Sequence, residues 1–127
     1  LTTAIRSLVA MPPRAVDLAG LFPDAGMHRA AFAMAEVECV EDTKVVFALG
    51  SDDGFALWVN GQNIETQDRS RPFAERESLI PATLRKGQNK ILLRINQNSG
   101  PWMFDLQIDA QDNWPAQLTW IAYTENQ

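Results

Sequence analysis

The sequence predicts an all-β protein built as a sandwich of two antiparallel sheets. No stretch has the apolar spacing of a long amphipathic helix. Instead, short segments that alternate between apolar and polar residues are separated by turn signals, which is typical of sandwiches and barrels. With 127 residues, 46% of them hydrophobic, the chain suits one well-cored domain and is too short for two.

The N-terminal part leads into this domain. Residues 1–14 are expected to form a lead-in strand or linker, which Pro12-Pro13 interrupts, and residues 15–127 to form a single domain. Residues 16–22 are expected to contain a short turn of helix. A long strand is then expected at 29–40, where Ala, Phe, Met and Val take alternate positions.

Two turns with strong sequence signals follow. The segment Gly50–Gly54 is rich in residues that accept positive φ or bond their own backbone, which predicts a tight hairpin between strands at 44–49 and 55–59. Asn60-Gly61 predicts a second hairpin turn, because both residue types tolerate positive φ. A short strand is expected to begin near Ile64.

The C-terminal half contains a polar loop at 67–76, a segment at 78–84 that approaches the turn at 85–89, and further strands. Strands are expected at 90–96, 102–108 and 118–123. Period-two placement on matched strands predicts a core that consists of Phe47, Leu49, Leu57, Val59, Ile91, Leu93, Ile95, Phe104 and Leu106.

The segment Leu49–Ile95 resembles the galactose-binding-like jelly roll, especially the sugar-binding domain at the front of family 2 glycoside hydrolases. The resemblance rests on Leu57-Trp58-Val59-Asn60-Gly61, then a polar loop, then Lys86-Gly87-Gln88-Asn89-Lys90-Ile91-Leu92. It implies a jelly-roll β-sandwich. Asn60, Gly61, Gly87 and Asn89 suit turns and indicate the architecture, and they say almost nothing about a ligand.

Ser51-Asp52-Asp53-Gly54, followed by Leu57–Gly61, also resembles the core of a PA14 domain. In the lectin members of that family an Asp-Asp pair holds calcium, so the resemblance implies Asp52 and Asp53 as ligands. Asn60 stands where that family commonly has Asp. Calcium takes six to eight oxygen ligands, so two carboxylates alone are too few. We therefore expect Asp52 and Asp53 to shape the turn, and calcium is possible but not expected.

Candidate ligand-binding residues lie mainly in two loops. Trp102 follows the loop at 98–101, where its ring could stack on a sugar, and Trp58 is out of phase with the core residues of its strand, so it points to the opposite face. For both, structural packing is the competing interpretation. Planar hydrogen-bonding groups complete the set, and Arg in particular suits carboxylates or acidic sugars. These residues are Arg69, Arg71, Arg76, Gln97 and Asn98.

Composition excludes several classes of function. A net charge of −5 and a pI near 4.7 argue against nucleic acid, and no apolar run is long enough to insert in a membrane. Catalysis is not expected, because no paired carboxylates, Gly-x-Ser-x-Gly elbow or His-rich metal set is evident. The single cysteine, Cys39, is expected to be a small buried hydrophobe.

These observations predict a non-catalytic carbohydrate-binding module that belongs to a larger exported or cell-surface protein, located outside the cell, in the periplasm or at the cell surface. Its partners are expected to be carbohydrate and neighbouring domains of the parent protein. The alternative is a structural or protein-interaction sandwich without a sugar site. Convergence of the candidate side chains on one exposed patch favours the first, and a buried Trp102 or a flat apolar face around Trp58 favours the second.

Overall fold

The structure, a computed structural model, describes residues 2–10, 16–23, 29–68, 77–97, 101–110 and 118–126, and for residues 2–10 the backbone alone. The described residues form ten strands and one short helix. The elements are β1 (Thr2–Ala10), β2 (Val16–Asp17), α1 (Leu18–Leu21), β3 (Arg29–Cys39), β4 (Thr43–Asp52), β5 (Phe55–Val59), β6 (Gln62–Gln67), β7 (Ser78–Leu84), β8 (Gly87–Gln97), β9 (Met103–Ala110) and β10 (Leu118–Asn126).

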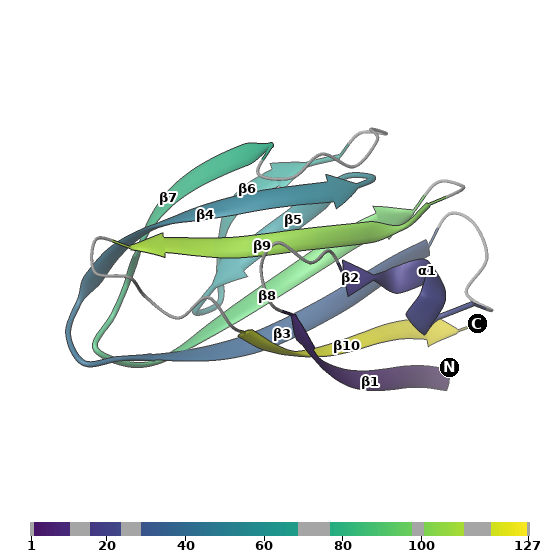
Figure 1. Ribbon diagram of the computed structural model, residues 1–127, viewed down its shortest axis with the longest axis horizontal. Helices are drawn as coiled ribbons and strands as arrows, with labels where there is room; N and C mark the ends of the chain where they lie inside the picture. The colour runs from purple at the N-terminus through teal and green to yellow at the C-terminus, as the bar shows by residue number, and fades with distance from the viewer. Residues whose placement is uncertain are drawn as a thin grey trace.

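The strands form two sheets that pack as layers (Figure 1). One sheet has six strands in the order β1-β10-β3-β8-β5-β6, and the other has four in the order β2-β9-β4-β7. All the strand pairs are antiparallel. The expected all-β, two-sheet antiparallel sandwich is confirmed. The lead-in segment contributes the edge strand β1, which pairs with β10 along its whole length.

The core lies between the two sheets, where alternate residues of each strand point inward. All nine residues predicted for the core are buried, and seven of them are fully enclosed. The residues between the inward ones point outward: on β3, Ala31, Ala33 and Ala35 are buried while Met34 and Glu36 are exposed. The short helix α1 closes one edge, where the Asp17 side chain caps it by accepting a hydrogen bond from Gly20 N at 3.1 Å.

The expected hairpin at Gly50–Gly54 is wrong. The strand before it, β4, pairs with β7 and β9, whereas the strand after it, β5, pairs with β6 and β8 in the other sheet. The segment is therefore a crossover between sheets. It is fixed by backbone hydrogen bonds from Asp53 N to Asn96 O (2.8 Å) and from Asn96 N to Gly54 O (2.9 Å), and the Asp52-Asp53 peptide bond is cis.

The Asn60-Gly61 turn is confirmed: it joins β5 to β6, with φ of 51° at Asn60 and 84° at Gly61. Gly87 also has positive φ, 94°, in the turn before β8. The two turns contact each other, because Asn60 Nδ2 donates to Asn89 Oδ1 at 2.9 Å. The two halves of the sequence motif thus form one hydrogen-bonded unit at one end of the sandwich.

Candidate functional site

One end of the sandwich gathers polar side chains from three separate segments. Asp52 and Asp53 end β4, Asp68 follows β6, and Asn96 and Gln97 end β8. We call these five residues the polar end. They are tied together, because Asn96 bonds the Asp53 and Gly54 backbone and its Nδ2 donates to Asp68 Oδ1 at 3.0 Å. The two predicted loops, 67–76 and 97–102, both start from this end.

Asp68 is the accessible acidic group of the polar end. Its carboxylate also accepts a hydrogen bond from Arg94 Nη2 at 3.0 Å, and its side chain is 60% exposed. It therefore has capacity for further hydrogen bonds from a ligand, since an ionised carboxylate offers about four acceptor sites. Sequence reasoning counted Asp68 among the planar hydrogen-bonding groups of the 67–76 loop but did not predict its pairing with Arg94, which lies 26 residues away.

Asp52 and Asp53 are buried, with 8% and 6% of their surface exposed. The neighbouring Ser51 hydroxyl donates to Asp53 O at 2.7 Å, which stabilises the crossover. In the described part of the chain, no three His, Cys, Asp or Glu side chains come together as metal ligands.

Trp102 is not an exposed platform, and this prediction needs correction. The side chain is fully buried, its ring N–H donates to Ile95 O at 3.1 Å, and its ring lies 6.4 Å from that of Phe22. Its backbone carbonyl accepts from Leu18 N, so it also anchors helix α1. The physical reason is its phase: Trp102 lies in register with the inward residues Phe104 and Leu106 of β9.

The other candidates have different outcomes. Trp58 is half-buried on the outer face of the six-stranded sheet, as its phase predicted. Gln97, a member of the polar end, is buried, at 9% exposure. The remaining candidates lie outside the described residues, and they are Arg69, Arg71, Arg76 and Asn98.

The outer face of the six-stranded sheet has an apolar band. One cross-strand row contains Ile121, Met34, Leu92 and Trp58, on β10, β3, β8 and β5 in turn. Met34 and Ile121 are 38% and 46% exposed. In the next row, Phe32 and Tyr123 stack with ring centroids 5.3 Å apart. The strand pattern around Phe32 predicted alternation but not this band, because the band depends on which strands are neighbours.

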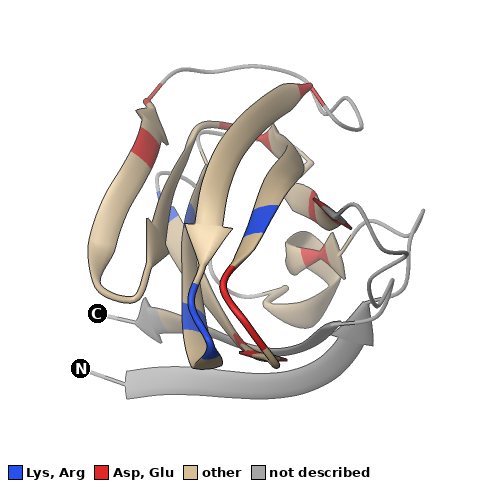
Figure 2. Ribbon diagram, turned by 90° about the vertical axis from the view of Figure 1, so that its left-hand side faces the viewer, with Lys and Arg blue, Asp and Glu red and all other residues tan. Residues whose placement is uncertain are grey.

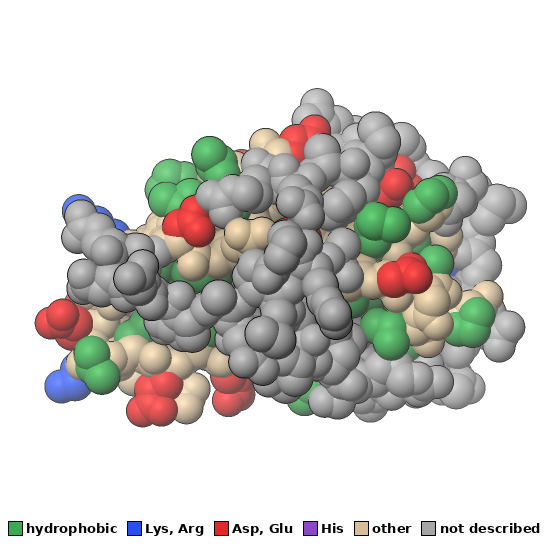
Figure 3. All heavy atoms as spheres, in the orientation of Figure 1, with side chains coloured by type: hydrophobic (Ala, Val, Ile, Leu, Met, Phe, Trp, Pro, Cys, Tyr) green, Lys and Arg blue, Asp and Glu red, His purple; other side chains and the backbone are tan. Residues whose placement is uncertain are grey.

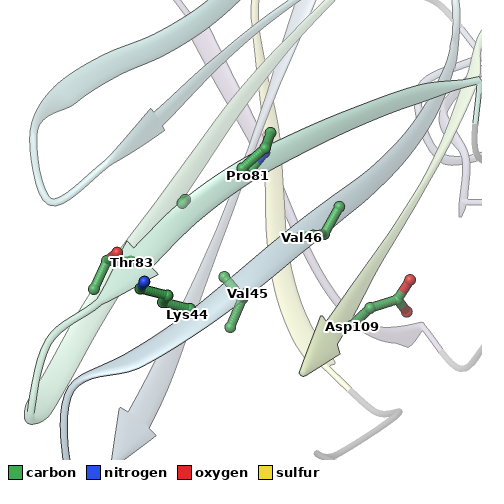
Figure 4. Close-up of a pocket in the computed structure, with 7 residues that line it drawn as sticks. Lys44, Val45, Val46, Pro81, Thr83 and Asp109 are labelled. Atoms are coloured by element: carbon green, nitrogen blue, oxygen red, sulfur yellow. The ribbon is translucent and has the colours of Figure 1, made fainter. Parts of the chain in front are cut away.

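A second surface feature is a shallow hollow of about 590 Å³ on the four-stranded sheet, formed by β4, β7 and β9 (Figure 4). Val46 and Pro81 form an apolar part, with Lys44 and Thr83 on one side and Asp109 on the other. It is open to solvent, and the described candidates Trp58, Gln97 and Trp102 are not among the residues that line it.

In the coloured part of the ribbon, basic and acidic positions are short segments separated by neutral stretches of the strands (Figure 2). On the face seen in Figure 3, acidic and hydrophobic side chains reach the surface side by side.

Cys39 is buried as predicted, and burial raises the pKa of its thiol. A protonated thiol is a poor nucleophile. No helix among the described residues is both long and apolar enough to cross a membrane.

Solved structures with similar folds include the PA14 domain of the MpAFP antifreeze protein, with a TM-score of 0.55 and 18% identity over 66% of this chain and 44% of that one. This chain thus spans less than half of that protein's length. Others are a GH31 α-xylosidase from Xanthomonas citri (TM-score 0.49, 11% identity, 97% of this chain and 16% of that one) and a family 35 carbohydrate-binding module from Clostridium thermocellum (0.44, 11%, 97% and 98%). Neither a protein-family profile nor a curated protein matches the chain. The likeness to the PA14 domain shows a shared β-sandwich fold, in agreement with one of the two resemblances seen in the sequence.

Proposed function

We propose that this chain is a non-catalytic carbohydrate-binding module, and that its sugar site is the polar end together with the loops that start there. The observation that carries the proposal is the joining of three segments at one end: Asp53, Asp68 and Asn96 belong to different parts of the chain and are linked by hydrogen bonds. A rigid sandwich that holds loops at one end is a common way to build a binding site.

The chemistry of this end suits sugar hydroxyls. Asp68 offers a carboxylate, Arg94 an oriented guanidinium and Asn96 an amide, and such planar groups recognise hydroxyl pairs through directional hydrogen bonds. Because Trp102 is buried, no aromatic platform is assigned to this end. A site that binds a strongly hydrated ligand mainly through hydrogen bonds gains little free energy from burying apolar surface, so we expect a Kd of about 1 mM.

The module is proposed to be non-catalytic, because glycoside hydrolysis needs two carboxyl groups facing one cleft, and two of the three carboxylates at this end are buried. We further propose that it serves a larger exported or cell-surface protein, with binding independent of calcium. The resemblance of Ser51–Gly54 and Leu57–Gly61 to the PA14 domain supports an accessory module of this type.

The test is a glycan-array screen with and without calcium. The domain is displayed on a tetravalent carrier, because multivalency makes affinities near ~1 mM measurable. We expect binding to a restricted set of glycans in both conditions, and at least ~10-fold weaker binding for Asp68→Ala. Glu38→Ala, an exposed carboxylate at the far end of β3, is the matched control. Binding to no glycan, or binding that Asp68→Ala leaves intact, contradicts the proposal.

A second candidate function is a structural or interaction domain. Two observations favour it: Trp102 is buried, and Trp58 belongs to an apolar band on an open sheet face. This function does not require the polar end to bind anything. The two candidates are compatible, because the band crosses the outer face of the six-stranded sheet, whereas the polar end lies where β4, β6 and β8 end.

A further inference from the structure

The central strands of the six-stranded sheet, β3 and β8, have complementary outer faces. On β3 the outward residues include Glu36 and Glu38 and no base, whereas on β8 they include Lys90 and Arg94 and no acid. In the ladder Glu36 lies opposite Lys90. The sheet therefore presents an acidic strand beside a basic strand, with the apolar band crossing both.

This arrangement has an internal symmetry. The order β10-β3-β8-β5 has the β3–β8 boundary at its centre, with one further strand on each side. Consider a second copy packed on this face, related by a twofold axis that runs parallel to the strands and between β3 and β8. That axis places β3 of one copy over β8 of the other, and β10 of one copy over β5 of the other. Each outward residue of one copy then faces, in the other copy, the residue that is its cross-strand partner within the sheet.

We propose that the outer face of the six-stranded sheet is a self-association surface, whose occupant is a second copy of this chain packed face to face about that axis. The axis places Glu36 of each copy over Lys90 of the other. In the same way it places Met34 over Leu92, and Trp58 over Ile121, so that the apolar band meets itself. Two sheets packed in this way keep their strands roughly aligned, within about 30°.

Charge complementarity selects a second copy over other occupants. In the pair, opposite charges meet at two symmetric positions, one on each side of the axis, and exposed apolar side chains are withdrawn from water. The Glu36–Lys90 pair lies six residues along the ladder from Asn96, so this surface is separate from the proposed sugar site.

The size of the face indicates a weak dimer. Six strands spaced about 4.8 Å apart and in contact over about 20 Å give roughly 600 Å² per copy, or ~1,200 Å² in total, at the lower limit of specific interfaces. Association is therefore expected at a Kd on the order of 100 µM, below which the chain is a monomer.

The test is sedimentation velocity from ~10 µM to ~1 mM, where the mass should rise from 14.2 kDa toward about twice that value. Glu36→Lys and Lys90→Glu should each weaken self-association at least ~10-fold, because each places like charges face to face. An equimolar mixture of the two variants should recover a dimer, since the new lysine at position 36 meets a glutamate at position 90. Lys86→Glu, an exposed lysine in the turn before β8, is the control and should dimerise normally.

Circular dichroism melting of each variant separates lost association from lost folding, because only folded variants enter the comparison. A monomer at every concentration overturns the proposal. A dimer that persists in both single variants also overturns it, because another surface must then be responsible. Recovery in the mixture is the result that a merely structural role of these residues does not produce.

Discussion

Asn89 offers the sharpest test of how the fold is held together. Its side chain is fully buried, its Oδ1 accepts from Arg85 N and Asn60 Nδ2, both at 2.9 Å, and its Nδ2 lies within hydrogen-bonding distance of three backbone carbonyls. Asn89→Ala removes these bonds. Each bond contributes about 1 kcal/mol net, and a buried polar group left without a partner costs roughly 1 to 3 kcal/mol. Water replaces part of the loss at the exposed edge of the turn, so we expect a decrease of about 3 kcal/mol in the free energy of unfolding.

For a domain of this size that decrease corresponds to a Tm lower by roughly 10 to 20 °C. Urea denaturation of the wild type and the variant measures it, with an expected shift in midpoint at unchanged slope. Gln88→Ala is the matched control, since Gln88 is the exposed neighbour in the same turn and should change stability by less than about 0.5 kcal/mol. Equal effects of the two substitutions would refute the reasoning that Asn89 joins the two turns.

Four further predictions concern the core. Leu93→Ala should cost about 2 to 5 kcal/mol in urea denaturation, because Leu93 is fully enclosed; a change under about 1 kcal/mol would contradict the register of β8. Trp102→Phe should lower the Tm by several degrees, because the Ile95 carbonyl loses its buried donor, and an unchanged Tm would show that this hydrogen bond contributes nothing. Since burial raises the pKa of the Cys39 thiol, that thiol should react with Ellman's reagent at pH 8 much more slowly in the native protein than in urea, and equal rates would show that it is accessible. The same raised pKa predicts stability that is fully present below the unfolded pKa near 9 and falls as the pH rises further, measurable as a declining Tm.

Much of the fold could be predicted because alternation reports directly which side of a strand is buried. The period-two rule placed Leu57 and Val59 inward and Trp58 outward, as the structure has them. The same rule already placed Trp102 in phase with Phe104. The contrary expectation came from its position after a loop, and position along the chain says less about exposure than phase does.

Other features depend on contacts between distant segments and could not be predicted from one sequence. The residues Gly50–Gly54 show that the chain turns, but not which sheet the next strand joins, since both outcomes use the same turn chemistry. The Asn60–Asn89 hydrogen bond and the pairing of Asp68 with Arg94 each join residues more than 25 positions apart. The acidic strand β3 lies beside the basic strand β8 because the two strands pair in the sheet, and the sequence alone does not indicate that pairing.

The central claim is that a sugar binds at the polar end. It is tested most directly by NMR titration of the ¹⁵N-labelled domain with a glycan selected from the array. We expect amide shifts centred on Asp53, Asp68 and Asn96 that reach half of their maximum near ~1 mM glycan, and we expect these shifts to be lost in Asp68→Ala with the rest of the spectrum unchanged. Shifts centred instead on Trp58 and Met34, or no shifts with any glycan, would contradict it.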